Sequence, residues 1–386
     1  MRVIVLFFLF CCGVASAQPL QVGLRSMAWN PRFAEFGAVT SAWANGAIKM
    51  PYVQSDKAGV AARINEALYL RHMGMPAPLT AGKTFALADG AEVPASTASQ
   101  EVTILRNDGR ILSFQIDREG CGAYCENYAE TVSFDARTGR VITLEDVLNA
   151  HGRAEIPKRM LEERIRQYRA QIKQLQQQLK ALRTKGKAVA ADTVDDLESR
   201  VSLNETCLEE AQQKQVSKAW DLVDFLRFEL PAEKGMVFTS GRCSNHASRA
   251  LDDVGDVSLT VAAQALDKML TPYGQSLILD APSVQEPTTV FHQVLHGKIG
   301  AIAITALLTS SSYGAGEPSI SGIYAYNKYR KPIALSGKQV GQTLSLQEAG
   351  DDKARASMTL QLGQTGLSGQ WEGNHKKLPM TLLVGK

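Results

Sequence analysis

The sequence predicts an α+β protein: a mixed α+β module that carries an inserted antiparallel helical hairpin, followed by a small antiparallel β-barrel or β-sandwich. Three observations predict this. Strand and helix patterns alternate on both sides of a heptad-spaced stretch, that stretch is rich in Arg, Lys and Gln, and the last hundred or so residues form short strand patterns between turns. A length of 386 residues accommodates two or three such units. The expected units are the module at 18–280, its hairpin arm at 157–218, and the β domain at 281–386.

Residues 1–17 have the layout of a secretory signal peptide. One positive residue precedes an apolar run, and Ala15-Ser16-Ala17 supplies the small residues of a cleavage site. The run is shorter than the roughly 20 residues that cross a bilayer, which disfavours a membrane anchor. Cys11 and Cys12 raise the alternative of a lipoprotein, but bulky residues precede them. We expect cleavage after Ala17, no integral membrane segment afterwards, and a periplasmic or secreted location.

The first half of the module alternates strands with one long helix. A strand at 48–52 ends at Pro51, and apolar residues between Val60 and Leu70 recur at helical spacing. Asn107-Asp108-Gly109 is a strong hairpin signal. We therefore expect paired strands at 101–105 and 111–116, another strand at 129–135, and a short helix that begins at Asp146.

Two heptad seams predict the arm. The first seam comprises Leu161, Ile165, Tyr168, Ile172, Leu175, Leu179 and Leu182, and the second comprises Val194, Leu197, Val201, Asn204, Leu208 and Ala211. A break around Gly186 lets them fold back as an antiparallel hairpin, of which each helix is roughly 36 Å long at 1.5 Å per residue. Asn204 is expected to fix the register. The arm is either a spacer packed on itself or a docking surface for a partner.

The rest of the module resumes the mixed pattern. We expect strands at 225–228 and 236–238, an amphipathic helix at 262–270, a closing turn at 271–274, and a proline-containing linker at 281–287.

Regular short strands make up the β domain. They are expected at 290–295, 299–308, 320–326, 333–336, 344–347, 356–362, 367–371 and 380–384. Tyr324 and Tyr326 share one face of their strand, and Trp371 lies near the end of another. Flat aromatic rings stack on sugars or anchor proteins, so these three are candidate binding residues; the alternative is that they fill the core.

Four cysteines remain after cleavage: Cys121, Cys125, Cys207 and Cys243. An even number in an oxidising compartment predicts two disulfides. Three pairings are possible, and we favour Cys121–Cys125 with Cys207–Cys243. A zinc site is the alternative, but no His lies beside Cys121 or Cys125 and the usual Cys-x-x-Cys spacing is missing.

Common catalytic motifs are missing from the sequence, including Gly-x-Ser-x-Gly, His-Glu-x-x-His and the phosphate-binding loop. Cys243 near His246 resembles an activated nucleophile, but a disulfide accounts for the cysteine and leaves His246 as a structural hydrogen-bonding residue.

Two other groups of candidate metal ligands lack a ligand spacing. Asp252, Asp253 and Asp256 do not match a calcium loop, and His292 and His296 share a strand face only loosely. We expect no metal, no cofactor and no catalytic residue. The formal net charge of +3 gives no support for a nucleic-acid partner.

Several segments together resemble a known family. They are Ile48-Lys49-Met50-Pro51 with Arg63-Ile64-Asn65, Phe134-Asp135-Ala136-Arg137-Thr138-Gly139-Arg140 with Leu144-Glu145-Asp146-Val147, and the stretch 262–274. The family is the uncharacterised α+β module of the extracytoplasmic part of lysozyme-sensing anti-sigma factors, which also lies beside peptidoglycan deacetylase domains. The resemblance covers roughly 48–279 without the arm. It implies a binding role near the cell wall, for lysozyme or a glycan.

The expected function is therefore that of an exported, non-enzymatic binding protein of the bacterial cell envelope. Its partner is an envelope protein, with lysozyme as one candidate, or a cell-wall glycan. The first alternative is a cell-wall hydrolase whose site is built from distant segments. The second is a scaffold that assembles through the arm.

Overall fold

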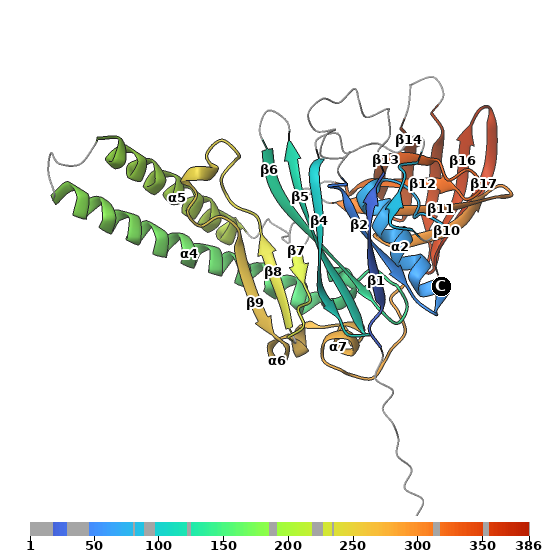
Figure 1. Ribbon diagram of the computed structural model, residues 1–386, viewed down its shortest axis with the longest axis horizontal. Coiled ribbons are helices and arrows are strands. Elements are labelled where there is room, and N and C mark those ends of the chain that lie inside the picture. The colour runs from blue at the N-terminus through green and yellow to red at the C-terminus, as the bar shows by residue number, and fades with distance from the viewer. Residues whose placement is uncertain are drawn as a thin grey trace, which may run out of the picture.

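The computed structural model describes residues 18–28, 46–79, 82–88, 97–121, 125–184, 191–217, 227–233, 235–311, 317–349 and 355–385. The expected signal peptide lies outside these residues. A helical arm, a layer of small sheets with helices, and a barrel follow one another along the molecule (Figure 1). The expected α+β class, with its helical hairpin and a closed antiparallel barrel, is confirmed. No helix in the described part of the chain is long and apolar enough to span a membrane.

Three small sheets lie edge to edge in the module. The first has the order β2-β1-β3, the second β4-β5-β6 and the third β7-β8-β9. A parallel bridge between Ile48 and Gln100 joins the first two. Thr131 Oγ1 donates to the Phe228 carbonyl at 2.6 Å and joins the last two. The strands are β1 (Gln21–Met27), β2 (Lys49–Gln54), β3 (Thr84–Phe85), β4 (Thr97–Asn107), β5 (Ile111–Cys121), β6 (Cys125–Asp135), β7 (Arg227–Glu229), β8 (Gly235–Ser240) and β9 (Val257–Ala262).

Pro51 does not end its strand, so that prediction is wrong. β2 runs on to Gln54, and Pro51 pairs with Leu24 of β1. β2 is the outer strand of its own sheet, where a residue without an N–H is tolerated. The expected hairpin between β4 and β5 is confirmed. Asp108 Oδ1 accepts from the backbone N–H groups of Arg110 and Ile111, and Gly109 supplies the positive φ of the turn.

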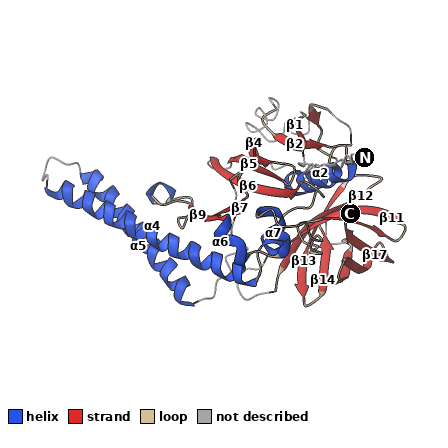
Figure 2. Cartoon of the chain, turned by 90° about the horizontal axis from the view of Figure 1, so that it is seen from below, coloured by secondary structure: helices blue, strands red, loops and turns tan. Residues whose placement is uncertain are grey.

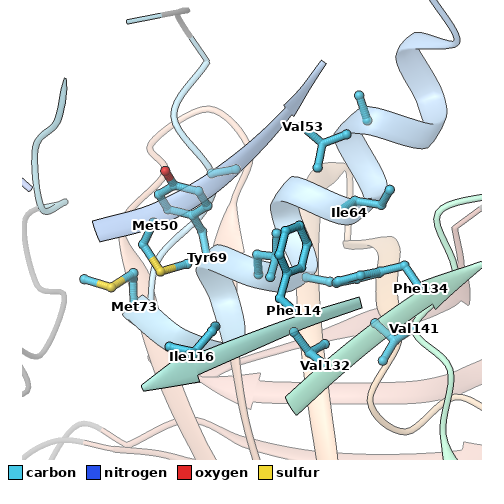
Figure 3. Close-up of a cluster of buried hydrophobic side chains, with 14 of the residues drawn as sticks. Met50, Val53, Ile64, Tyr69, Met73, Phe114, Ile116, Val132, Phe134 and Val141 are labelled. Atoms are coloured by element: carbon cyan, nitrogen blue, oxygen red, sulfur yellow. The ribbon is translucent and has the colours of Figure 1, made fainter. Parts of the chain in front are cut away.

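Two apolar cores hold the module together. In the first, helix α2 (Ala58–Met73) packs Ile64 and Tyr69 against Phe114 and Phe134 of the sheet (Figure 3). The second lies under β8 and β9 and is covered by α3 (Leu144–Val147), α6 (Ala263–Leu266), a 3-10 turn at Asp267–Met269 and α7 (Pro272–Ile278).

The helix predicted over 262–270 is therefore shorter than expected. The predicted turn at 271–274 is instead the start of α7. Thr271 caps this helix by accepting from the Gly274 N–H, and Pro272 occupies the first turn, where its missing N–H costs nothing.

The arm consists of α4 (Ala150–Thr184) and α5 (Ala191–Ser217), which extend away from the barrel (Figure 2). Its first helix begins at Ala150 rather than at Pro157. The Asn149 side chain accepts from the Gly152 N–H, and Pro157 then removes a single hydrogen bond in the second turn. The first seam is buried as expected from Leu161 to Leu179.

The arm is fastened at its base. Arg164 donates to Ser240 Oγ at 2.7 Å, Tyr168 Oη contacts Asp252 at 3.3 Å, and the Cys207–Cys243 disulfide joins α5 to the loop after β8. Asn204 is fully buried, but its amide donates to the Leu251 carbonyl of this loop. Asn204 thus anchors the arm to the module.

Eight strands of the described chain, β10 to β17, close into the barrel by pairing β10 with β17. They are β10 (Val294–Ile299), β11 (Ile302–Ser311), β12 (Ser319–Tyr326), β13 (Pro332–Val340), β14 (Thr343–Glu348), β15 (Ser357–Leu362), β16 (Gly366–Gly373) and β17 (Lys376–Val384). The first two strands begin later than predicted, because Gly300 makes the turn between them. Alternate apolar residues fill the interior.

Candidate functional site

A cleft of about 670 Å³ lies between the module and one end of the barrel. Strand β6, the 141–145 segment and α2 contribute one part of its wall. The linker at 288–292 contributes much of the rest, together with barrel residues at or beside the ends of β11, β12, β13 and β15. Its lining residues are Arg71, Thr131, Val132, Ser133, Val141, Ile142, Thr143, Leu144, Glu145, Phe228, Thr288, Thr289, Val290, Phe291, His292, Ser310, Pro318, Gln339, Leu362, Gly363 and Gln364.

A buried ion pair fixes the linker wall. Arg140 donates to both carboxylate oxygens of Asp146 at 2.9 Å, and both side chains are fully buried. Thr289 Oγ1 lies 2.5 Å from Arg140 Nη2 and donates to Asp146 at the same distance. A buried charge pair with extra hydrogen bonds tolerates only one geometry, so the linker is held at a defined position.

Three further contacts hold the barrel against the module. Arg63 forms an ion pair with Glu286 of the linker at 3.2 Å. Gln293, which is fully buried, donates to the Val141 carbonyl at 2.9 Å. Arg330, in the turn after β12, donates to the Ala77 carbonyl at 2.5 Å beyond the end of α2. These contacts connect the module to the linker and to the barrel at three separate points, which supports a defined position of one relative to the other.

Several polar side chains of the cleft are not used inside the protein. No hydrogen bond among the described residues involves the side chains of Arg71, Thr288, His292, Ser310 or Gln364. A ligand in the cleft can therefore form hydrogen bonds with these groups, which include hydroxyl, amide, imidazole and guanidinium groups.

Two phenyl rings, those of Phe228 and Phe291, complete the lining. Each is partly buried and packs against one of the apolar cores, Phe228 in the module and Phe291 in the barrel. Rings held in this way offer apolar surface to a ligand without large losses of side-chain entropy.

Burial lowers the pKa of His292 to about 4, and the positive charge of Arg71 adds to the effect. The imidazole is therefore neutral near pH 7, with one nitrogen that donates and one that accepts. His292 also adopts a positive φ of 63°, immediately before β10. The chain is thus bent where the linker enters the barrel.

A cluster of charged and polar side chains from α2, β5 and β6 adjoins the cleft at Arg71. The Glu130 carboxylate lies 3.0 Å from His72 Nδ1 and 3.5 Å from Arg118. The hydrogen bond from His72 is the main cause that lowers the pKa of Glu130, to about 2, with Arg118 and Arg71 adding to it against burial. Burial lowers the pKa of His72 to about 4. Near pH 7 the cluster therefore holds one carboxylate, two guanidinium groups and a neutral imidazole.

The three residues predicted to bind a ligand meet at the other end of the barrel. Tyr324 and Trp371 are buried in the interior, and Tyr326 is partly buried. Tyr324 Oη and Trp371 Nε1 both donate to Glu348 Oε1, at 2.5 and 3.0 Å. Tyr324 and Trp371 therefore stack no ring against solvent, and the core alternative describes them better.

The other predicted residues have structural partners. Both favoured disulfides, Cys121–Cys125 and Cys207–Cys243, are formed. His246 Nδ1 lies 2.8 Å from Glu126. Asp252 accepts from the Ser244 and Gly255 N–H groups, Asp253 pairs with Arg200, and Asp256 pairs with Arg227.

A second groove, of about 750 Å³, lies beside the β5–β6 hairpin. Its lining includes five carboxylates and three guanidinium groups, so it carries an acidic excess. Three of the carboxylates are already paired, Glu101 with Lys49, Glu126 with Arg242, and Asp256 with Arg227. Tyr128 adds an exposed ring at its rim.

Sequence reasoning did not find the cleft. Its polar groups come from positions as far apart as Arg71 and Gln364, and no motif links them. One signal was available, because Arg140 and Asp146 belong to the segments that carried the family resemblance.

No family model matches the chain, and no curated protein matches it. Among solved structures, the crystal structure of a DUF3298 family member from Bacteroides fragilis aligns with 69% of this chain and 100% of its own length. The TM-score is 0.37 and the identity 10%, a likeness too remote to assign a function. The expected connection to anti-sigma factors or deacetylases stays a prediction.

Proposed function

We propose that the protein is an exported, non-enzymatic binding protein that recognises a cell-envelope glycan in the cleft between its module and its barrel. The supporting observation is the set of uncommitted polar side chains in that cleft, together with the rings of Phe228 and Phe291. Sugars present hydroxyl and acetamido groups around a partly apolar ring, and such a lining complements them.

The proposed location outside the cytoplasm is supported by the two disulfides, which form and persist in oxidising compartments. The fixed walls support binding as the role of the cleft, because a preorganised site loses less entropy when a ligand enters.

The experiment is sedimentation of the mature protein with insoluble cell walls. Gln364→Trp fills the cleft from the turn between β15 and β16, and Thr365→Trp places the same ring on the neighbouring residue, which does not line the cleft. We expect Gln364→Trp to abolish co-sedimentation and Thr365→Trp to retain it. Equal binding by both variants, or no binding by the wild type, would refute the proposal.

Recognition of a basic protein is the second candidate, with lysozyme as the partner that the family resemblance implies. The acidic groove beside the β5–β6 hairpin favours it, since carboxylates attract a cationic surface. Gel filtration of an equimolar mixture with lysozyme tests it. A complex that is weakened by Glu119→Gln would support this function, and two separate peaks for the wild type would dismiss it.

A further inference from the structure

The cleft holds one guanidinium group, that of Arg71, which makes no hydrogen bond or close ion pair with the described residues. We propose that Arg71 binds a carboxylate there, and that the ligand is an acidic saccharide, a sugar with a carboxylate beside its hydroxyl and acetamido groups. This inference rests on the proposed function and names its ligand class.

The position of Arg71 separates it from the other arginines around the cleft. It lies in the last turn of α2, exposed, while the next two residues along the helix, His72 and Met73, are buried. Arg63 pairs with Glu286 of the linker, and Arg140 pairs with Asp146. Arg330 donates to a backbone carbonyl beyond the end of α2. Arg71 is the one arginine among the described residues that line this cleft. Its side chain makes no hydrogen bond with them.

The local charge favours an anion. Glu130 is the carboxylate that acts on Arg71, but it is shared with Arg118 and hydrogen-bonded to His72. Two guanidinium groups share this one carboxylate, so Arg71 has no carboxylate of its own. The carboxylate that lines the cleft, Glu145, already has an interaction inside the protein. His292 adds no charge near pH 7.

The remaining lining suits a sugar ring attached to that carboxylate. Thr288 and Ser310 offer hydroxyl groups, and Gln364 offers an amide. Guanidinium binds carboxylate with two parallel hydrogen bonds, which orients the rest of the ligand. A volume of about 670 Å³ lies within the range of sites for small ligands.

Two disaccharides isolate the contribution of the carboxylate. N-acetylglucosaminyl-N-acetylmuramic acid carries a lactyl ether with its carboxylate, and N,N′-diacetylchitobiose has a hydroxyl in its place but is otherwise alike. We expect calorimetry with the full mature chain to show tighter binding of the acidic disaccharide, by about tenfold to a hundredfold, as charge-assisted hydrogen bonds provide. Added salt is expected to weaken that preference.

Three variants test the residue itself. Arg71→Gln should remove the preference for the acidic disaccharide, because it weakens the binding of that sugar much more than the binding of the neutral one. Arg71→Lys should keep part of the preference, because it retains the charge but not the paired donors. Arg169→Gln, which removes an exposed arginine on the arm, is the matched control and should behave as the wild type. Thermal melting checks that each variant is folded.

The outcomes separate this inference from the proposed function. If the wild type binds both disaccharides equally, or if Arg71→Gln loses affinity for both equally, the carboxylate role is wrong while cleft binding stands. If the wild-type protein binds neither disaccharide but still sediments with cell walls through the cleft, the ligand is not an acidic saccharide. Loss of sedimentation altogether would refute the proposed function.

Discussion

Removing the Asp146 carboxylate is expected to destabilise the protein severely. In Asp146→Ala, the fully buried Arg140 guanidinium loses the carboxylate with which it forms an ion pair, and Thr289 loses an acceptor. Arg140 Nη1 already has no hydrogen-bond partner among the described groups, so little is left to compensate the charge. Breaking a buried pair on one side costs about 3–5 kcal/mol, against a typical total stability of about 5–15 kcal/mol.

Denaturation by urea measures this loss, and cell-wall sedimentation reports whether the linker wall keeps its position. The matched control is Glu198→Ala, which breaks the exposed Arg183–Glu198 pair and should cost less than about 1 kcal/mol. Replacing both partners, as Arg140→Met with Asp146→Leu, should restore much of the stability, because no isolated charge remains. A loss for Asp146→Ala as small as that of the control would refute the reasoning.

Three further predictions concern other parts of the chain. Because the pKa of His72 is about 4 in the fold and about 6.5 unfolded, the unfolded chain alone takes up this proton between those values. For this group, stability should fall by up to about 3 kcal/mol as the pH drops through that window. His72→Asn should make the slope shallower in urea titrations and leave the part due to His292, whose pKa is also about 4; an unchanged slope would contradict this. Replacing Cys207 and Cys243 by Ala opens a 36-residue separation and should cost about 4 kcal/mol, against about 2 for Cys121 and Cys125, which are 4 residues apart; thermal melts with the reverse order would contradict the loop argument. Exchanging residues 175–197 for a short Gly-Ser turn should leave melting of the rest and cell-wall binding unchanged, because this part of the arm packs on itself; lost binding would favour the docking or scaffold interpretation.

Local sequence patterns predicted which helices and strands form better than where each one begins and ends. The heptad spacing from Leu161 to Leu179 set which face of α4 is buried, because side-chain burial follows the helical period directly. The beginning of α4 was missed, since Asn149 caps the helix before the seam starts. The prediction that the strand ends at Pro51 was wrong, because a strand tolerates proline where no neighbouring strand needs a backbone N–H at that position.

The cleft could not be predicted, for a physical reason. Spacing reports contacts within one element, whereas Arg71 and Ser310 meet through the docking of a barrel on a module. The aromatic residues showed the same limit. Alternation placed Tyr324 and Tyr326 on one face correctly, but only closure of the barrel determines that this face is the interior.

The contacts of Thr289 with Arg140 and Asp146 make the cleft depend on the docking of two separate halves. Its lining is contributed by a module that can pack its own cores and by a barrel that closes on itself. Neither half contains the complete surface, so the binding site comes into existence only when the segment around Thr289 settles on Arg140 and Asp146. Ligand binding therefore reports whether the module and the barrel are docked on each other, which the secondary structure of either half alone does not report.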